Sequence, residues 1–506
     1  MTSQTTIALL SAALIASVAM ADATAPRALV NTDPNGSLAL PDGTIVSSFV
    51  QARLRLSSRG SWWALTAFAT GQPSSNDTFV LVGTADGLDR AIGETVAQPG
   101  LGVGFVGVPN AQLGVNESGD LALKSTTNGP ISANEVVAKQ SAATGAWTLI
   151  AREGDPISVF PGESHSVFLD SVTLLDSGRV FYRSASTSGS LGSDFDDHLL
   201  LSDPVASALQ SGTITPLAQL GGTTAVMTNF NDEAFVSEPN GAGQQVLLVD
   251  GNLGAPVNNR ALAVGPIGGP FTVIVQRGAS LPGLPGELPY TSSSLTDGAQ
   301  LYAGGDWVVW GTSAGGLSYL IVNGTPRVVE GDAIPGAARG ETVKSVQQAA
   351  MNSLGDLAYL VESSQSRTHL VVERQGKAPI TVARSFNSTL EIASATQVDY
   401  DGDGFLDDAH CGFFNDNNLG LSDAGEVYFV GRVTSALTGL NVGDGLFVIS
   451  LPSACVGDLD ANGVVDAADL ATLLGGWGNA GATDLDGSGI TGAEDLALLL
   501  GAWGGC

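Results

Sequence analysis

A short strand pattern that starts with glycine recurs along most of this 506-residue chain. Seven copies can be counted, and asparagine replaces glycine in the fourth, which is compatible because asparagine also adopts positive φ. The copies are GSWWA at Gly60, GDLAL at Gly119, GRVFY at Gly178, NDEAF at Asn231, GDWVV at Gly305, GDLAY at Gly355 and GEVYF at Gly425. A long repeat built only of short strands is typical of a β-propeller.

Each copy is followed 13 to 21 residues later by a second apolar strand. These second strands are FVLVG at Phe79, EVVAK at Glu135, HLLLS at His198, QVLLV at Gln245, SYLIV at Ser318, HLVVE at His369 and LFVIS at Leu446. A third strand follows in most units, for example from Trp147, Phe271, Arg327 and Ile380. We therefore expect three strands in each unit.

The last unit has no third strand, because Pro452 follows LFVIS almost at once. The segment RALVNTD, from Arg27, looks like a third strand without a unit. A propeller must protect its strand edges, so we expect this segment to pair with LFVIS and close the ring. The sequence thus predicts a mainly β protein with a seven-bladed propeller over residues 22–452. A pair of β-sandwiches is the alternative, although sandwiches have no reason to keep a seven-fold order.

Chemistry inside the repeat region is harder to identify. The four histidines, His165, His198, His369 and His410, lie in different units without metal-ligand spacing, and His198 and His369 are expected at strand edges. Residues 251–270, rich in Gly, Pro and Asn, are expected to form a surface loop. We recognise no nucleophile motif or phosphate-binding glycine loop in this region.

The last fifty residues contain a duplicated acidic motif. DLDANGVVDAADL from Asp458 and DLDGSGITGAEDL from Asp484 lie 26 positions apart, with oxygen-bearing side chains at positions 1, 3, 5 and 12 and glycine at position 6. Calcium requires six to eight oxygen ligands, which a twelve-residue loop with a sharp turn at position 6 can supply. Two Ca²⁺ sites are therefore expected. The predicted ligands are Asp458, Asp460, Asn462, Val464, Asp466 and Asp469 in the first loop, and Asp484, Asp486, Ser488, Ile490 and Asp495 in the second.

A short apolar stripe follows each loop at the spacing of a helix. We expect these stripes to lie in one small shared core. Their members are Leu470, Leu473, Leu474 and Trp477, and Leu496, Leu499, Leu500 and Trp503.

A third acidic segment has the spacing of a calcium loop, but His410 stands at position 12. Two interpretations stay open for it, a third calcium site or an acidic surface loop. Its candidate ligands are Asp399, Asp401, Asp403, Phe405 and Asp407.

Residues 455–506, within an expected tail domain of residues 453–506, resemble a dockerin domain of the kind called GC-type, which begins near a cysteine and ends in Gly505 and Cys506. The resemblance implies a small all-α domain with two EF-hand-like calcium loops that docks onto a cohesin-like or other cell-surface protein. Dockerins use small hydroxyl residues at loop positions 10 and 11; here those positions hold Ala467, Ala468, Ala493 and Glu494. Because Cys455 and Cys506 bracket this tail and antiparallel calcium helices bring such ends together, we expect them to form a disulfide.

Residues 1–21 contain an apolar run ending in Ala19, Met20 and Ala21, the pattern of a signal-peptidase site. Export is therefore expected, with a secreted or cell-surface location and no membrane span after signal removal. The chain holds 20 Lys and Arg against 50 Asp and Glu, a net charge of −30. This charge argues against nucleic acid as a partner.

Two functions remain open at this level. The first is a non-catalytic binding or matrix protein attached through its calcium-dependent tail. The second is a secreted polysaccharide-degrading enzyme, a glycoside hydrolase or lyase, displayed by the same tail. A pair of carboxylates about 5 to 9 Å apart in a deep pocket would favour the enzyme.

Overall fold

The computed structural model describes most of the repeat region and part of the tail. The described residues are 26–32, 40, 44–49, 54–70, 77–94, 97–106, 112–130, 133–186, 197–202, 207–210, 226–230, 235–237, 245–253, 259–267, 270–289, 295–302, 305–375, 377–386, 396–397, 409–413, 419–435, 438, 440–451, 457, 459, 464–479, 483–485 and 490–505. Among them, no helix has both the length and the apolar character needed to cross a membrane.

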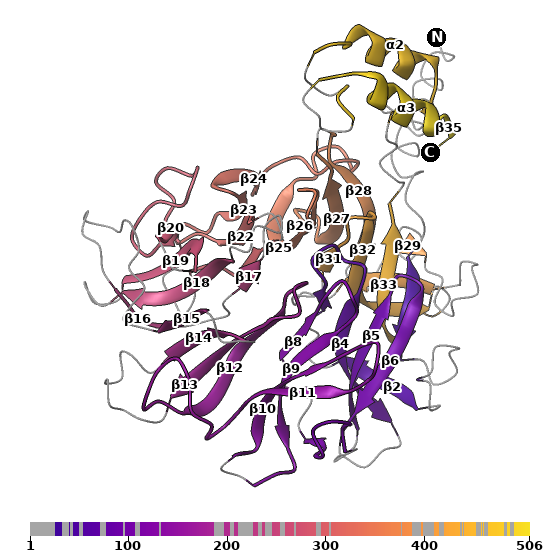
Figure 1. The fold of residues 1–506 in the computed structure, drawn as a ribbon. Helices are drawn as coiled ribbons and strands as arrows, with labels where there is room; N and C mark the ends of the chain where they lie inside the picture. Colours follow the sequence, from indigo (N-terminus) through magenta and orange to yellow (C-terminus); the bar gives the residue numbers. More distant parts are fainter. Residues whose placement is uncertain are drawn as a thin grey trace, which may run out of the picture.

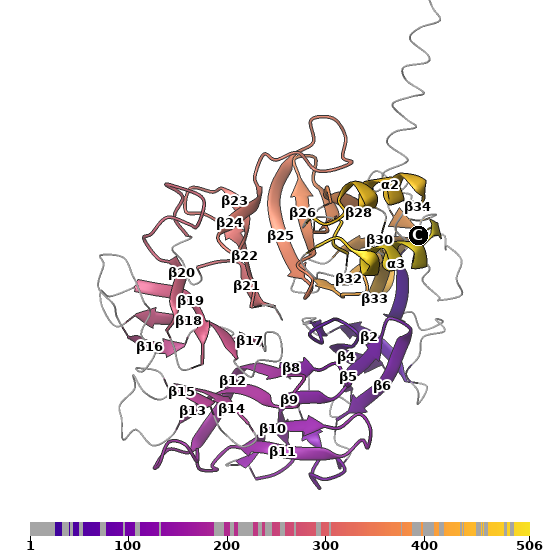
Figure 2. The ribbon, with the colours of Figure 1, turned by 45° about the horizontal axis from the view of Figure 1, so that its top comes forward.

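The body is a seven-bladed β-propeller, in which seven antiparallel sheets follow one another around a ring (Figures 1 and 2). We number the blades from 1 to 7 along the chain. Within a blade, the strands succeed one another from an inner first strand to an outer fourth strand.

The strands of the first three blades have the following bounds. Blade 1 contains β2 (Ile45–Phe49), β3 (Arg55–Leu56), β4 (Trp63–Thr70), β5 (Thr78–Thr84) and β6 (Gly87–Gly93). Blade 2 contains β7 (Phe105–Val106), β8 (Gln112–Val115), β9 (Leu121–Thr127), β10 (Glu135–Gln140) and β11 (Trp147–Arg152). Blade 3 contains β12 (His165–Leu174), β13 (Val180–Ser186), β14 (Asp197–Leu201) and β15 (Ser207–Gln210).

The remaining blades continue this pattern. Blade 4 contains β16 (Met227–Phe230), β17 (Phe235–Ser237), β18 (Val246–Leu253), β19 (Asn259–Pro266) and β20 (Thr272–Gln276). Blade 5 contains β21 (Gly298–Leu301), β22 (Trp307–Thr312), β23 (Ser318–Val322) and β24 (Thr325–Val329). Blade 6 contains β25 (Val343–Met351), β26 (Leu357–Ser363), β27 (Arg367–Glu373) and β28 (Ile380–Phe386). Blade 7 contains β29 (Thr396–Gln397), β30 (Ala409–Phe413), β31 (Leu419–Leu421), β32 (Glu426–Ser435), β33 (Asn441–Ser450) and the N-terminal β1 (Arg27–Asn31).

The expectation of three strands per unit is wrong, because each blade has a further inner strand before its glycine. This strand is continuous in blades 3, 5 and 6 and is divided into two short segments in the other four. In blade 2, for example, β7 and β8 both pair with β9. Short, interrupted strands carry little periodicity, so the sequence pattern does not reveal them.

Blade 4 corrects two further expectations. The NDEAF copy leads into β17, which pairs with β18 as part of the inner strand, so QVLLV is the second strand of the blade and not the third. The expected surface loop at 251–270 contains β19, which pairs with β18 along eight residues, from Val246↔Pro266 to Leu253↔Asn259.

The recurring glycine has a physical reason. In six blades it ends the turn between the first and second strands with φ between 76° and 83°, the left-handed region that favours glycine. Its N–H donates to the carbonyl three residues earlier, as from Gly119 to Asn116 (2.9 Å) and from Gly355 to Asn352 (3.2 Å). The pattern GDLAL therefore encodes a turn followed by a strand.

The expected closure of the ring is confirmed. β1 pairs antiparallel with β33 of blade 7, with Arg27 opposite Val448 and Val30 opposite Leu446. Arg27 also donates from Nη2 to the carbonyl of Ala85 in blade 1. The N-terminal strand thus completes the last blade and also contacts the first.

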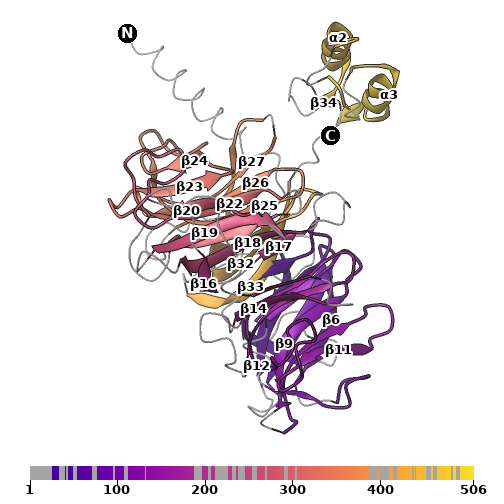
Figure 3. The same cartoon turned by 60° about the vertical axis from the view of Figure 1, so that its left-hand side comes forward.

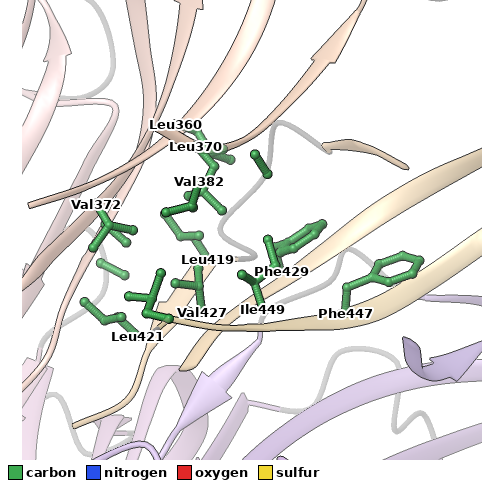
Figure 4. Close-up of a cluster of buried hydrophobic side chains, with 14 of the residues drawn as sticks. Leu360, Leu370, Val372, Val382, Leu419, Leu421, Val427, Phe429, Phe447 and Ile449 are labelled. Carbon is green, nitrogen blue, oxygen red and sulfur yellow. The ribbon is translucent and has the colours of Figure 1, made fainter. Parts of the chain in front are cut away.

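Seven hydrophobic clusters fill the spaces between the blades, one at each boundary around the ring. Figure 4 shows the cluster between blades 6 and 7, where Leu360 and Leu370 lie near Leu419, Val427 and Ile449. Another cluster joins Leu29 and Val30 of β1 to Leu65 and Leu81 of blade 1. This complete set of boundaries rules out two separate sandwiches, because each cluster draws on two consecutive blades.

The tail contains two short helices with a small core of their own. Its elements are β34 (Val464–Val465), α2 (Ala467–Gly475), α3 (Ala493–Gly501) and β35 (Gly504–Gly505). The helices contact each other, and α2 contacts β34 (Figure 3). Val465, Leu473 and Leu499 are completely buried in this core.

Candidate metal site in the tail

Two buried aspartates occupy position 12 of the two acidic loops. Asp469 and Asp495 have relative exposures of 0% and 1%, and each lies in the first turn of its helix. The helices therefore begin two residues before position 12. A buried carboxylate requires charged or hydrogen-bonding partners, because removing it from water is costly.

The two loops provide these partners in the same way. Asp469 accepts hydrogen bonds from the N–H of Leu459 (2.6 Å) and of Asp466 (2.8 Å). Asp495 accepts from the corresponding N–H groups, those of Leu485 (2.6 Å) and Gly492 (2.5 Å). The duplication seen in the sequence is thus a duplication of geometry.

This arrangement is compatible with a hard cation. Each oxygen of an ionised carboxylate has two lone-pair sites, so an oxygen that accepts one N–H bond can also interact with a second partner. Asp466 at position 9 uses Oδ1 to accept from Ala468 N–H (2.7 Å), which caps α2. The described residues contain no group of three or more His, Cys, Asp or Glu that could hold a metal.

The predicted ligands are described only in part. Val464, Asp466, Asp469, Asp484, Ile490 and Asp495 belong to the described residues. Outside them lie Asp458, Asp460, Asn462, Asp486 and Ser488, all five candidates of the third loop from Asp399 to Asp407, and both Cys455 and Cys506. The ligand sets and the disulfide therefore stay predictions.

The two halves of the tail are held together crosswise. Val465, in the first loop, pairs with Gly504 beyond α3. The corresponding residue of the second loop, Thr491, accepts from the N–H of Gly478 beyond α2 (2.9 Å). The first loop is thus bonded to the segment that follows α3, and the second loop to the segment that follows α2.

The shared core is smaller than the apolar stripes predicted. Leu473 and Leu499 are buried, and Leu470 and Leu496 pack partly against them. The rest of each stripe is exposed, with relative exposures of 52% for Leu474, 45% for Trp477, 52% for Leu500 and 49% for Trp503. We name Leu474 with Trp477, and Leu500 with Trp503, the two Leu–Trp faces.

The histidines of the body also correct an expectation. His198 and His369 are not at exposed edges, since their relative exposures are 0% and 1%. Both lie on the third strand of a blade, where His198 pairs with Ser184 and His369 pairs with Val361. Their matching places in the HLLLS and HLVVE copies could have indicated a common buried position.

His369 belongs to a buried polar network around Glu341. Glu341 accepts hydrogen bonds from Ser363 Oγ (2.6 Å), and His369 Nε2 lies 3.1 Å from the same carboxylate oxygen. Arg367 Nη1 lies 3.3 Å from the other oxygen. Burial alone would raise the pKa of Glu341, but the hydrogen bonds from Ser363 and His369 outweigh it, so the pKa lies below its usual value. Such a fully partnered carboxylate stabilises the blade.

The same hydrogen bond from a serine hydroxyl to a glutamate recurs in the connection between blades 4 and 5. Glu287 accepts from Ser313 Oγ (2.6 Å), as Glu341 does from Ser363. Ser313 directly follows β22, and Ser363 is the last residue of β26, so each serine lies at the end of its blade's second strand. The sequence pattern did not single out these glutamates, although each directly follows a glycine in a segment with proline and glycine after an outer strand.

Scans against family models and against curated proteins find no match. Among solved structures, the β-propeller domain of the Trilobed protease from Pyrococcus furiosus has a TM-score of 0.39 and 10% identity, covering 78% of this chain and 95% of that one.

Two peptidases are also similar in structure. A prolyl endopeptidase has a TM-score of 0.38 and 12% identity over 81% of this chain and 52% of its own, and a puromycin-hydrolyzing peptidase of Mycobacterium tuberculosis has 0.35 and 10% over 82% and 55%. This chain thus spans about half the length of either peptidase. All three TM-scores are below 0.5, so the propeller assignment rests on the sheets and the cores between them.

Proposed function

We propose that this chain is a secreted, non-catalytic binding or surface protein, in which a propeller body is attached to a partner by a calcium-dependent, dockerin-like tail. Residues 1–21 are the signal peptide, 22–452 the body and 453–506 the tail. The repeated bonding of Asp469 and Asp495 is the observation that carries this proposal.

The reason is that the same carboxylate geometry occurs twice at the same loop position. One buried aspartate can be an isolated helix cap, but two equivalent ones, each preceded by an acidic loop with glycine at position 6, fit a pair of calcium loops. Calcium would supply positive charge to a segment with eight acidic residues and no Lys or Arg between 453 and 506. Its binding free energy would then contribute to folding of the tail.

The two Leu–Trp faces support docking. Of the twelve large apolar side chains exposed among the described residues, six lie in the tail, although it is a small part of the chain. Exposed apolar patches of this kind mark interaction sites. We propose that these faces contact a cohesin-like or other cell-surface protein, and that Cys455 and Cys506 form a disulfide that joins the ends of the tail.

Calcium stoichiometry of the full-length protein tests the proposal. We expect two bound ions per chain by equilibrium dialysis and elemental analysis, or three if the loop from Asp399 also binds. Asp458→Ala and Asp484→Ala should each remove one ion, because position 1 opens the ligand set.

Glu494→Gln is the matched control, since Glu494 is an acidic residue of the same tail outside the predicted ligand set. It should keep both ions. A full-length protein that binds no calcium, or that keeps its stoichiometry in both aspartate variants, contradicts the calcium-dependent tail.

A further inference from the structure

The turns between the first and second strands form contacts that cross from blade to blade. We call them the inner turns: Ser57–Gly60 in blade 1, Asn116–Gly119 in blade 2, Leu175–Gly178 in blade 3, Asn352–Gly355 in blade 6 and Ser422–Gly425 in blade 7. Each is closed by a hydrogen bond from its glycine N–H to the first residue of the turn, at 2.8 to 3.1 Å in blades 1, 2, 3 and 7 and 3.2 Å in blade 6. Equivalent turns lie at the same end of every blade, so neighbouring ones can meet.

Blades 6 and 7 are joined by a carboxylate. Asp423 accepts hydrogen bonds from the N–H of Ser353 (2.9 Å) and from its hydroxyl (2.5 Å). Asn352 Nδ2 donates to the carbonyl of Ser422 (3.1 Å). These two adjacent inner turns thus share three hydrogen bonds.

The same turn of blade 7 reaches across the seam of the ring to blade 1. The N–H of Asp423 donates to the carbonyl of Arg59 (2.8 Å). The backbones approach so closely that a Cβ at Gly60 would lie 2.5 Å from Cα of Ser422. A side chain at Gly60 would therefore force the two blades apart.

Carboxylates continue the chain into blades 2 and 3. The N–H of Arg59 donates to Glu117 (2.6 Å), and the N–H of Glu117 donates to Asp176 (3.0 Å). Ser58 Oγ also donates to Asp176 (2.5 Å). Hydrogen bonds thus run without a break from Ser353 to Asp176 through five consecutive blades, including the seam.

We propose that the inner turns are a second closure of the propeller, acting at the seam independently of β1. β1 closes the ring at the outer edge of blade 7, where it pairs with β33. The inner turns close it through the backbone N–H of Asp423, which donates to Arg59 of blade 1, while the carboxylate of Asp423 joins blade 7 to blade 6. The two closures lie on different strands of the blade, so either one holds blades 7 and 1 together when the other is weakened.

Hydrogen exchange of the full-length protein, read by mass spectrometry on peptides of β4 and β33, tests this proposal. Val30→Asp weakens β1, because Val30 is fully buried against blade 1. Gly60→Ala weakens the inner closure at the seam, because a Cβ at Gly60 would lie 2.5 Å from Cα of Ser422. In each single variant, the exchange rate of β4 should stay within about threefold of that of the parent protein. In the double variant, the exchange rate of β4 should exceed the product of the two single effects by about tenfold or more.

Gly178→Ala is the matched control. Gly178 ends the inner turn of blade 3 with a φ of 80°, as Gly60 ends that of blade 1 with 78°, but a Cβ at Gly178 would come near only Lys139 Nζ, at 3.4 Å. Combined with Val30→Asp, it should add no excess exchange in β4. The proposal is overturned if Val30→Asp alone exposes β4 fully, or if Gly60→Ala and Gly178→Ala behave alike in the Val30→Asp background.

Discussion

His165 is a buried histidine with an unusual environment for a titratable group. It is 4% exposed at the start of β12, with Nδ1 2.8 Å from Ser184 Oγ and its ring against Phe168 and Tyr182. Burial, and after it the charge of the nearby His198, lowers the pKa of His165 from 6.5 to about 4. The folded protein therefore holds this imidazole neutral where an unfolded chain would protonate it.

The pKa of His165 is lower in the folded than in the unfolded protein. The free energy of unfolding is therefore not reduced by protonation of His165 above pH 6.5, and it decreases as the pH falls toward 4. The loss should reach about 3 kcal/mol for this one group. We expect His165→Gln to reduce the fall in the urea-unfolding free energy between pH 7 and pH 4 by about that amount. If the variant loses as much stability as the parent protein over this range, protonation of His165 is not the cause.

At the scale of elements, β1 contributes more than its five residues suggest. Ala28, Leu29 and Val30 have relative exposures of 1% or less, and they pack against both neighbouring blades. Without β1, β33 becomes an open edge able to pair with another chain. This strand is thus a stabilising contact and a protection against aggregation.

A chain that starts at Leu40 should therefore be less stable than one that starts at Asp22. Burial of Leu29 and Val30 alone is worth about 4 kcal/mol. We expect a lower melting temperature by calorimetry and a concentration-dependent increase in size by light scattering. Equal melting temperatures and a monomeric shorter chain would show that β1 is dispensable for closure.

At the scale of the molecule, the body and the tail have separate hydrophobic cores. The tail's core of Val465, Leu473 and Leu499 shares no member with the seven clusters between the blades. Separate cores unfold as separate units when few contacts link them.

Removal of the two ions predicted in the tail should therefore affect one unit only. We expect calorimetry of the full-length protein to show two transitions, of which the smaller moves to lower temperature when EDTA replaces excess calcium. Spectra in the far ultraviolet should lose helical signal in parallel. A single transition insensitive to calcium and chelator would contradict both the metal site and the independence of the tail.

Local patterns determined much of this protein. A glycine that must adopt positive φ, followed by alternating or continuous apolar residues, specifies a turn and a strand wherever it occurs, so Gly119 or Gly355 reveals its blade without knowledge of the rest. The missing third strand after LFVIS likewise identified β1 as its partner, because an unpaired edge is costly in any sheet. The duplicated acidic loops could also be recognised from the sequence, because each motif lies within twelve consecutive residues.

Other features were decided only when the chain folded. The inner strands are short and interrupted, and they are held by the neighbouring second strands, so their own residues carry no clear period. His198 and Glu341 are buried because other strands and connections cover them, which composition alone does not reveal. Leu474 and Trp477 fit a helical core in the sequence, yet two nine-residue helices offer too little surface to cover them. Neighbouring residues determine turns and strands. The burial of a side chain depends on which distant segments pack against it, and only the tertiary structure determines that packing.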